Sequence, residues 1–538
     1  MKEDQFEQII TSLEWLVGNE EPDSKQIAEV LLPKAANYLL PISEGIEIRR
    51  RYAWLENIPF LETLAWSALF ALRKIRNKDS DRPKTMEIDF DWNIDRTGFS
   101  NKPSINQRGV LCLFSMQSYA SMIVEIAKSL KSNNQNVSVL APAAANGWGA
   151  FQNKIDDVGF YNIETFLSTE VKKKYLEEID EGKNNWAPKM KEIMANGPAE
   201  LRDCIKIDPT AVKYLSTEVI PQIRAIKKIA QSTLLFLNPT VLVITRLKRI
   251  VENVFAREAQ LQGIPIILAN HGHVGIDWDV QDLGAVDSVC SRITAWNEGQ
   301  KKVWATLFPN IDEQSIVVSG GVMWDRVIRL FRSKGSDEKQ RIRKHIVKAL
   351  GAQGEIVPNI SKKWIVITVD GYLEPSLSAI INKIKEVDGI DVLIKIRPHN
   401  KKEEYSLYAY STAIISENMN VDLHELLFAC DLCITTVSTT NLDALSVGTP
   451  VLTITVDDTS RSIDRYIYLE QFGLPLVDDV ASLSKVLYQW TTDKEIAEYW
   501  KTATDKAARE YIANYPEGNA GQMFNKMIDL LVTEKCRP

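Results

Sequence analysis

Residues that can bind an anion follow two apolar runs in the C-terminal half of the chain. The run DVLIKI leads into RPHN, which places the guanidinium of Arg397 and the imidazole of His399 at its end. The run LCITT leads into VSTTN, which places the hydroxyls of Ser438, Thr439 and Thr440 ahead of the helical segment LDALSV. Free amides at a helix N-terminus favour a negatively charged group. Together, the two segments predict a phosphate-binding site.

Each of these residues also has a structural interpretation. Ser438 and Thr439 are of the types that cap helices in any protein. An arginine at a strand end, such as Arg397, is as often part of an ion pair at a domain interface. The binding interpretation is favoured when the segments are taken together, because adjacent strand ends would present His399 and the Ser438–Thr439 pair to one phosphate.

Strands and helices alternate around both segments, and this alternation predicts the fold class. Apolar runs that suit buried parallel strands stand at 110–114, 240–245, 264–270, 363–370, 391–396 and 432–436. Helical segments separate them, and a β-α-β order implies parallel, right-handed units. We therefore expect an α/β protein with parallel sheets. The loop after the first strand, residues 115–119, lacks the GxGxxG fingerprint of dinucleotide-binding proteins.

Two further residues can act as a general base. His271 opens the sequence HGHVGID after the strand at 264–270. A neutral imidazole there can remove a proton from a hydroxyl, and its cation can neutralise a phosphate. A histidine that only shapes the turn explains the same residue. The strand at 363–370 ends in Asp370, a second candidate base or a group that orients an imidazole. Because HGH followed by Asp277 or Asp279 has no known zinc spacing, we predict no metal site.

These motifs resemble the nucleotide-binding half of GT-B glycosyltransferases. The resemblance is carried by RPHN at 397–400 and by VSTTNLDALSVGTPV at 437–451, where a serine-threonine pair precedes an acidic residue and Gly-x-Pro-Val. It is strongest to enzymes of bacterial surface and capsular polysaccharide biosynthesis. These are capsule Kdo transferases, sialyl- and polysialyltransferases, and polyol-phosphate polymerases of the teichoic acid type. The resemblance implies two Rossmann-like domains that face a cleft.

The resemblance also implies roles for the donor-side residues. His399, Ser438 and Thr439 match the positions that hold the nucleotide phosphate, and Asp443 matches a glutamate that contacts the donor ribose. Two positions depart from the family. Asn400 stands where proline is usual, and Asp443 is one methylene shorter than glutamate.

The two candidate bases have counterparts as well. His271 matches a His-Gly pair that faces the cleft between the domains in many of these enzymes. Asp370 and Gly371 match the last two positions of an acidic-acidic-Gly motif that supplies the general base in bacterial sialyltransferases. The sequence leaves both residues as candidates, with His271 ranked first.

Composition limits the class of protein. The 538 residues are 45% hydrophobic and carry a formal net charge of −7, which supports large cores and argues against nucleic-acid binding. Cys430 and Cys433 form a single CxxC, so we interpret both as small buried hydrophobes in a reducing compartment. The start MKEDQFEQ lacks the apolar segment of a secretory signal, and no run is long enough to span a bilayer. We expect a cytoplasmic protein, either soluble or peripheral to the inner face of the cell membrane.

Four segments are expected along the chain. They are a helical N-terminal module at 1–105, an N-terminal Rossmann-like acceptor domain at 106–335, a C-terminal Rossmann-like donor domain at 336–510, and a C-terminal helix at 511–538 that packs back across the body. The linker between the two large domains is predicted to include 333–340 and 351–363, where glycine, serine and charge accumulate.

The N-terminal module is predicted to contain helices at 5–17, 24–40 and 59–76. The last of these ends in Arg73, Lys74 and Arg76, which suits either an anionic membrane or packing on the next domain. A membrane or protein partner is therefore expected to bind through residues 1–105, if it binds at all.

The predicted function is metal-independent transfer of a sugar from a nucleotide-activated donor to an acceptor hydroxyl, in surface polysaccharide or glycan biosynthesis. A CMP-activated 2-keto sugar acid is favoured as donor, the acceptor is a glycan or a lipid-linked molecule, and no separate cofactor is expected. One alternative is another enzyme on the same fold, either a CDP-polyol phosphotransferase or a non-hydrolysing nucleotide-sugar epimerase. A second is a non-catalytic nucleotide-binding scaffold, because a fold alone does not fix function.

Overall fold

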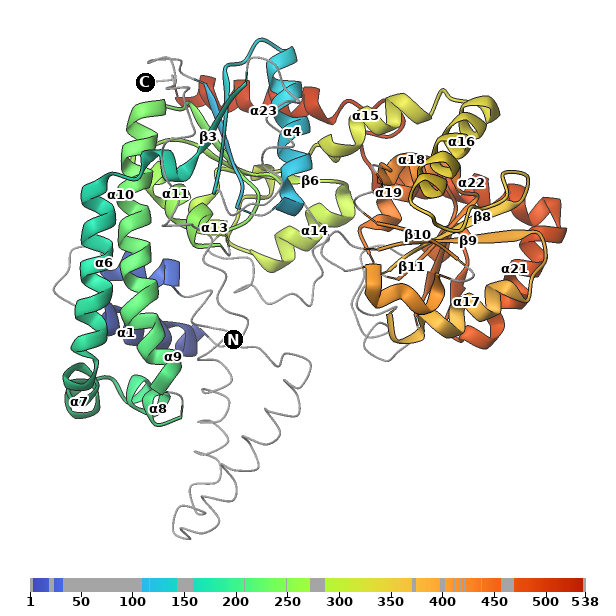
Figure 1. Ribbon diagram of the computed structural model, residues 1–538. Helices are drawn as coiled ribbons and strands as arrows, with labels where there is room; N and C mark the ends of the chain where they lie inside the picture. The colour runs from blue at the N-terminus through green and yellow to red at the C-terminus, as the bar shows by residue number, and fades with distance from the viewer. Residues whose placement is uncertain are drawn as a thin grey trace, which may run out of the picture. The chain divides into compact units, whose positions relative to one another are not determined.

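The computed structural model describes residues 3–18, 24–31, 109–115, 117–142, 158–207, 209–247, 249–270, 286–369, 374–396, 402–409, 412–416, 419, 421–436, 438–455 and 469–535. The chain divides into two compact units. The first comprises Met1–Leu268 and Asp279–Ser291, and the second comprises Ala269–Trp278 and Arg292–Pro538. Parallel strands, visible as arrows in Figure 1, form the centre of the fold.

The first sheet has seven strands in the order β3-β2-β1-β4-β5-β6-β7. These are β1 (Val110–Leu113), β2 (Val137–Ala141), β3 (Gly159–Asn162), β4 (Val241–Ile244), β5 (Ile266–Leu268), β6 (Arg292–Ala295) and β7 (Ile316–Val318). The central strands β1 and β4 pair in parallel and are buried at every position. Complete burial explains why their sequences are continuously apolar rather than alternating. The strands predicted at 110–114, 240–245 and 264–270 are confirmed.

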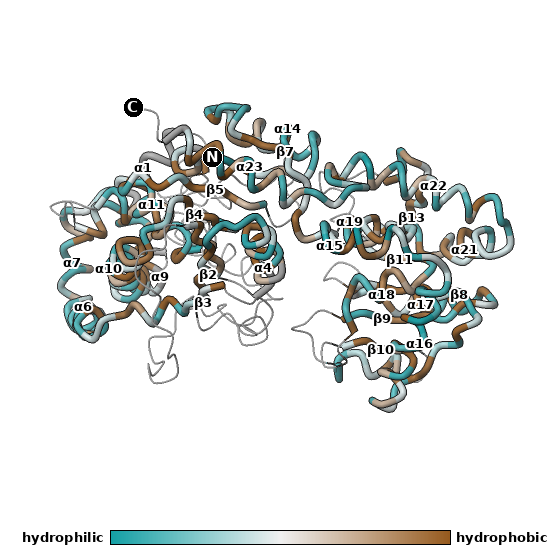
Figure 2. The backbone as a smooth tube through the Cα atoms, turned by 90° about the horizontal axis from the view of Figure 1, so that it is seen from above, coloured by the Kyte–Doolittle hydropathy of each residue, from teal (hydrophilic) through white to brown (hydrophobic). Residues whose placement is uncertain are grey.

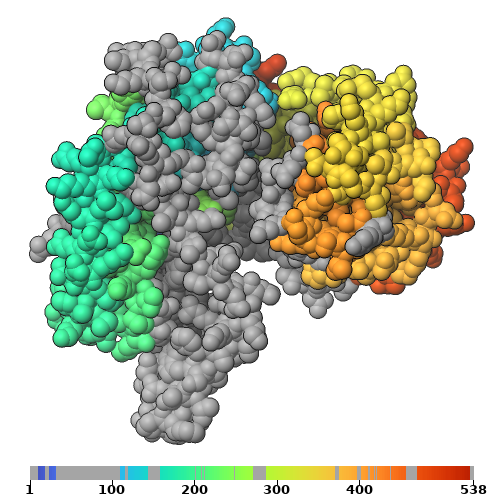
Figure 3. Space-filling model, in the orientation of Figure 1, coloured from blue at the N-terminus to red at the C-terminus, as the bar shows by residue number. Residues whose placement is uncertain are grey.

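Helices connect the strands of this sheet. They are α4 (Gln117–Ser132), α6 (Thr169–Asn184), α7 (Trp186–Asn196), α8 (Ala199–Ile207), α9 (Pro209–Tyr214), α10 (Ile220–Leu237), α11 (Ile250–Leu261), α13 (Val286–Val289) and α14 (Glu298–Leu307). Short 3₁₀ turns η3 (Ile163–Phe166) and η5 (Glu313–Ser315) and the π-helical turn η4 (Leu215–Val219) complete the path. The lysine run at 172–174 lies on α6, which is mostly hydrophilic in Figure 2 and forms part of the surface in Figure 3.

The N-terminal residues begin as helices that pack on the first unit. Helix α1 (Glu3–Val17) ends where Lys189 of α7 donates a hydrogen bond to the Leu16 carbonyl at 3.1 Å. Residues 24–31 are also helical, and there Glu29 pairs with Arg257 of α11. The helices predicted at 5–17 and, over its described part, at 24–40 are confirmed. The helix predicted at 59–76 lies outside the described residues.

The second sheet has six parallel strands in the order β10-β9-β8-β11-β12-β13. They are β8 (Lys363–Thr368), β9 (Ile390–Lys395), β10 (Ala413–Ile415), β11 (Leu432–Thr435), β12 (Val451–Ile454) and β13 (Leu476–Val477). The strands predicted at 363–370, 391–396 and 432–436 are confirmed as β8, β9 and β11. In both sheets the chain adds strands outward from the first strand and then returns to place the fourth strand on the other side of the first. This reversal of strand order is the doubly wound arrangement of α/β proteins.

The helices of the second unit surround this sheet. They are α15 (Val322–Phe331), α16 (Ser336–Ala352), α17 (Leu377–Lys385), α18 (Leu423–Ala429), α19 (Thr440–Ser446), α21 (Leu483–Thr492), α22 (Lys494–Tyr511) and α23 (Ala520–Lys535), with 3₁₀ turns η6 (Glu374–Ser376), η7 (Lys402–Tyr408), η9 (Leu469–Phe472) and η10 (Val480–Ser482). Among the described residues, no helix is both long enough and apolar enough to cross a bilayer.

The linker predicted at 333–340 is wrong for most of its length. Helix α16 begins at Ser336, inside that segment. Asp337 and Glu338 lie in its first turn, where negative charge is favourable. Ile342 and Ile346 then bury an apolar stripe at helical spacing. The charged composition therefore marks a helix start rather than an unstructured connection.

Asp431, just before β11, ties α16 to the sheet. Arg343 Nη2 donates to Oδ2 at 2.5 Å and Lys339 Nζ donates to Oδ1 at 2.8 Å, both from α16. The Trp364 backbone N–H of β8 donates to Oδ2 at 2.8 Å. Burial would raise the pKa of the Asp431 carboxyl, but the two cations and the hydrogen bonds outweigh burial and hold it below its ordinary value. The ionised carboxylate is thus part of the fold.

Cys430 and Cys433 flank Asp431 and are buried free thiols, as predicted. Burial raises the pKa of the Cys433 thiol to about 12, and it raises that of Cys430 as well. Neutral thiols of this kind pack as small apolar groups, so this CxxC provides no reactive thiolate near neutral pH.

Candidate functional site

The reversal of strand order in the second sheet indicates where a ligand can bind. The chain runs outward from β8 through β9 to β10 and then returns to β11 on the other side of β8. In doubly wound sheets, ligands bind outside the carboxyl ends of the strands at such a reversal. Thr368 ends β8 and Thr435 ends β11. Because Ile367 pairs with Ile434, the next residues, these two threonines, lie side by side.

The prediction that the segments after β9 and β11 leave adjacent strands is wrong. β8 lies between β9 and β11, so two strand spacings, roughly 10 Å, separate them. The chain completes one half of the sheet before it begins the other, and consecutive motifs therefore start from strands that are not neighbours. The neighbours of β11 are β12 and β8, and β8 is the strand that precedes Asp370 in the sequence. Asp370 itself, with His271, Arg397 and His399, lies outside the described residues.

The serine-threonine turn after β11 is half-buried, and its side chains hydrogen-bond within the turn. Ser438 Oγ lies 3.3 Å from Thr440 Oγ1 and accepts the Thr440 backbone N–H at 3.4 Å. Thr439 occupies the N-cap position of α19, but its side chain makes no capping hydrogen bond. The capping interpretation therefore accounts for Ser438 only weakly and does not account for the Thr439 hydroxyl.

Buried polar atoms without partners lie beside this turn. Thr435 is fully buried, and its hydroxyl has no hydrogen-bond partner in the described part of the chain. Asn441, in the first turn of α19, donates from Nδ2 to the Thr436 carbonyl at 3.1 Å, while its buried Oδ1 likewise has no partner there. The Thr368 hydroxyl lies near the Cys433 thiol and likewise has no hydrogen-bond partner in the described part of the chain. An unpaired buried polar group is costly and calls for an explanation. A ligand at the strand ends supplies one.

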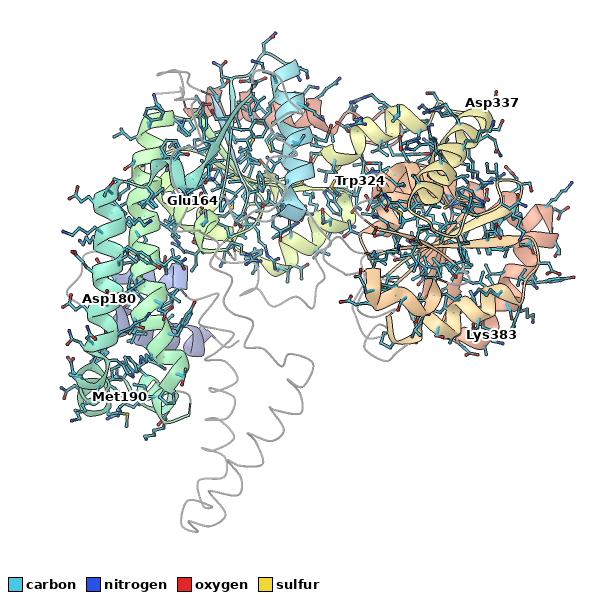
Figure 4. All side chains as sticks on the ribbon, in the orientation of Figure 1. Glu164, Asp180, Met190, Trp324, Asp337 and Lys383 are labelled. Carbon is cyan, nitrogen blue, oxygen red and sulfur yellow. The ribbon has the colours of Figure 1, made fainter. Side chains whose placement is uncertain are left out.

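Asp443 is the centre of a hydrogen-bonded cluster on α19. Its Oδ1 accepts the Trp324 indole N–H at 2.8 Å and lies 3.2 Å from His424 Nε2. Trp324, labelled in Figure 4, lies in the first turn of α15, and His424 lies in the first turn of α18. Only 16% of the Asp443 side chain is exposed. The sequence interpretation selected Asp443 but missed both partners, because neither Trp324 nor His424 belongs to a motif with Asp443.

The pKa of His424 reflects this cluster. Burial lowers it, but the hydrogen bond and charge of Asp443 and the charge of Asp422 outweigh burial and the nearby Arg326. The net result is a pKa raised above its ordinary value of 6.5. His424 therefore retains its proton to higher pH than a free histidine, and the cation then donates to the Asp443 carboxylate.

The Ser319-Gly320-Gly321 loop positions Trp324, and both glycines are required by close contacts. Gly320 has a φ of 77°, a left-handed conformation that side chains rarely adopt. A Cβ on Gly321 would lie 2.3 Å from the Trp324 ring. The glycine pair therefore permits a close approach of the backbone to the Trp324 ring. Next along α15, Asp325 accepts the Ala520 and Gly521 backbone N–H groups at 2.9 and 2.7 Å, which fixes the start of α23.

A second polar cluster lies at the reversal of the first sheet. Glu252, in the first turn of α11, is completely buried. Ser115 Oγ, after β1, donates to Glu252 Oε2 at 2.5 Å, and Thr245 Oγ1, after β4, donates to Oε1 at 3.0 Å. This carboxylate is satisfied by the protein and joins the two loops. No group of three histidine, cysteine, aspartate or glutamate side chains within the described ranges is arranged to hold a metal ion.

Comparison with known proteins places this architecture. Residues 341–497 match a family described as a protein of unknown function, DUF354. No curated protein matches the chain. UDP-GlcNAc 2-epimerase from Neisseria meningitidis, solved with UDP-GlcNAc, superimposes with a TM-score of 0.52 at 13% identity, over 78% of this chain and 99% of that chain. The chain has the GT-B fold.

A second solved structure, MnaA, agrees on the fold. MnaA from S. aureus, solved with UDP, has a TM-score of 0.50 at 12% identity and covers 79% of this chain and 97% of its own. The wall teichoic acid polymerase TagF matches 89% of this chain and 98% of its own at 13% identity, with a TM-score of 0.46. At these identities the likeness concerns the fold, so the chemistry of this chain has to be argued from its own residues.

Proposed function

We propose that this chain is a glycosyltransferase that binds a nucleotide-activated sugar at the carboxyl ends of β8 and β11. The observation that carries the proposal is two buried polar atoms that have no hydrogen-bond partner among the described residues, the Thr435 hydroxyl at the end of β11 and Asn441 Oδ1 in the first turn of α19. They lie beside the half-buried hydroxyls of Ser438, Thr439 and Thr440. A donor phosphate accepts hydrogen bonds from hydroxyls, and Asn441 Oδ1 can accept one from a donor hydroxyl or a bound water.

In this proposal the donor diphosphate or monophosphate lies against the turn at 438–440, and Asp443 contacts the ribose. Arg397 and His399 supply positive charge to the phosphate from the loop after β9. Because β8 separates that loop from β11, these two side chains have to reach across one strand. Long side chains such as arginine can do so, and the charge they supply stabilises the leaving phosphate as negative charge develops on it.

The transfer step needs a base for the acceptor hydroxyl. The hydroxyl loses its proton to His271 or Asp370, its oxygen forms a bond to the anomeric carbon, and the bond from that carbon to the phosphate oxygen breaks. The electron pair leaves with the nucleotide phosphate. Asp370 follows the strand adjacent to β11, which favours it for a role close to the phosphate. His271 remains the candidate for the acceptor side.

The donor is proposed as a nucleotide sugar, with CMP-activated 2-keto sugar acids as the first class to test, since the resemblance of the motifs points there. UDP sugars are the second class, because solved proteins of the same fold bind UDP and UDP-GlcNAc. An acceptor glycan or lipid-linked molecule, in surface polysaccharide or glycan assembly, completes the proposed reaction.

Calorimetric titration with CMP, CDP, UDP and their sugar conjugates tests the binding step. Specific binding should also raise the melting temperature by mass action. Ser438→Ala and His399→Ala should weaken binding of the same nucleotide. Ser482→Ala is the matched control, because Ser482 is half-buried in the same unit and its hydroxyl donates to the Asp479 carbonyl at 2.8 Å. Absence of binding by every nucleotide at millimolar concentration would contradict the proposal.

Turnover separates the enzyme classes that share this fold. A transferase releases nucleotide from its donor only when an acceptor is present, apart from slow hydrolysis. An epimerase converts UDP-GlcNAc with no acceptor added, and a scaffold leaves every donor intact. Chromatography of each donor with and without an acceptor mixture distinguishes these outcomes, and His271→Ala and Asp370→Ala then show which base is required.

A further inference from the structure

Two protein donors meet on one oxygen of the Asp443 carboxylate. Trp324 Nε1 lies 2.8 Å from Oδ1, and His424 Nε2 lies 3.2 Å from the same atom. They come from two different helices: α15 is distant from α19 in the chain, and α18 precedes α19 with strand β11 between them. Within the described part of the structure, no residue donates to Oδ2. The carboxylate therefore has one oxygen that accepts from the protein and one oxygen to which none of the described residues donates.

We propose that Trp324 and His424 are positioning residues that fix the Asp443 carboxylate so that Oδ2 is presented to the ribose of a bound nucleotide. This inference rests on the proposed function and adds to it the means by which the ribose contact is formed. It assigns functions to two side chains that lie outside every recognised motif of the chain.

The indole of Trp324 is held rigidly enough to act in this way. Its ring is fully buried and makes an edge-to-face contact with Trp296 at a centroid distance of 4.7 Å. The backbone of Gly321 lies so close to the ring that no side chain fits there. The ring cannot turn without disturbing these contacts, so its N–H points in one direction only. A hydrogen bond from such a donor orients its acceptor at little further entropic cost.

His424 is oriented from its own helix. Asp422 caps α18 by accepting the His424 and Glu425 backbone N–H groups, and its Oδ1 lies 3.7 Å from His424 Nδ1. With one ring nitrogen near Asp422, the other is directed at Asp443. The charged groups that act on the imidazole are Asp443 from α19, Asp422 at the start of α18, and Arg326 from α15. The two acidic groups outweigh the basic one, and they thus favour the donor form of Nε2 toward Asp443.

The short side chain of Asp443 fits this arrangement. A glutamate extends one methylene further from its helix and has one more rotatable bond. An aspartate that is held by two protein donors has its remaining oxygen fixed near the helix, which compensates for the shorter reach by removing side-chain freedom before binding. Residues that hold a binding group in this way act on affinity through orientation rather than through contact with the ligand.

Variants at the two positions test the proposal on the full chain. Trp324→Phe keeps an aromatic ring and removes the N–H. Trp304→Phe is the matched control, because Trp304 is buried in the same unit and its Nε1 has no hydrogen-bond partner in the described structure. His424→Gln keeps a side-chain N–H donor, whereas His424→Ala removes it. Melting temperatures of all variants show whether each protein is folded.

The readout is the dissociation constant for CMP and UDP, measured by calorimetry, and for their 2′,3′-dideoxy forms. We expect Trp324→Phe and His424→Ala to weaken binding of the ribonucleotide about three- to tenfold, and His424→Gln and Trp304→Phe to bind nearly as the wild type does. The loss should disappear with the dideoxy nucleotide, and it should be absent when Asp443→Ala is already present, because coupled residues are not additive.

Several results would overturn this inference. An equal loss with the dideoxy nucleotide, or a full loss in the Asp443→Ala background, would mean that Trp324 acts through the fold and not through Asp443. If the wild type binds nucleotide and Trp324→Phe binds it with the same dissociation constant, the positioning role is overturned and the proposed function is not. Failure of the wild-type protein to bind any of the nucleotides would overturn the proposed function, and this inference with it.

Discussion

Replacing Thr435 by valine should stabilise the unliganded protein and weaken its binding of nucleotide. Thr435 is fully buried at the end of β11, and its hydroxyl has no partner among the described residues. Valine has nearly the same shape and carries a methyl group in place of the hydroxyl. The substitution therefore removes a buried polar group that the described residues do not satisfy, and it also removes a group that the proposed phosphate site would use.

The two effects have opposite signs and similar sizes. A buried polar group without a hydrogen bond costs about 1–3 kcal/mol, so its removal should stabilise the free protein by at least about 1 kcal/mol. For a unit of roughly 250 residues this corresponds to a rise in melting temperature of about 2–4 °C. A hydrogen bond to a charged group contributes about 1.5–3 kcal/mol, so nucleotide affinity should fall about tenfold or more.

Differential scanning calorimetry of the free protein and titration with nucleotide measure the two effects separately. Thr449→Val is the control, because the Thr449 hydroxyl is buried in the same unit and donates to the Leu427 carbonyl at 2.8 Å. It should lose about 1 kcal/mol of stability and keep its affinity. The reasoning is refuted if Thr435→Val melts at a lower temperature than the wild type, or if it melts higher and binds nucleotide unchanged.

Three further perturbations test other parts of the second unit. Asp431→Ala leaves a buried guanidinium without its carboxylate and should lower the free energy of unfolding by about 3 kcal/mol in a urea titration, a loss that an unchanged midpoint would contradict. Gly321→Ala places a Cβ 2.3 Å from the Trp324 ring, so the protein should be less stable and the Trp324 indole N–H should exchange faster with solvent, as measured by NMR. Because the folded-state pKa of His424 is raised, its contribution to stability is present below pH 6.5 and is lost as pH rises through the folded-state pKa. Chemical unfolding at a series of pH values should show this fall in the free energy of unfolding for the wild type and not for His424→Gln.

Local patterns account for most of the secondary structure. Continuous apolar runs predicted the central strands β1, β4, β8 and β11, because a strand buried on both faces needs apolar residues at every position. The regular alternation of such runs with helical segments predicted parallel sheets, and the resemblance to GT-B enzymes added the expectation of two Rossmann-like domains. The segment at 333–340 was misassigned as a linker. Its charged residues and glycine are typical of a linker, but they also suit the first turn of a helix. Only the buried stripe further along α16 distinguishes the two.

The serine-threonine turn after β11 could also be anticipated, because serine, threonine and asparagine between a strand and a helix form a local signal. Its surroundings could not. That the Thr435 hydroxyl and Asn441 Oδ1 lack hydrogen-bond partners among the described residues depends on what packs around them, and no sequence pattern reports a missing contact. The positions of Arg397, His399, His271 and Asp370 in the site remain predictions.

The sequence by itself determined the strands, the helices and the types of residue that each loop carries, since these follow from periodicity over a few neighbouring positions. The tertiary structure decided which loops are neighbours. It placed β8 rather than β9 beside β11, and it brought Trp324, 119 positions away in the chain, to the carboxylate of Asp443. Such contacts arise where the strand order reverses and where helices from distant segments pack together. The free energy that favours them comes from packing throughout the core, so no short segment of the sequence determines it.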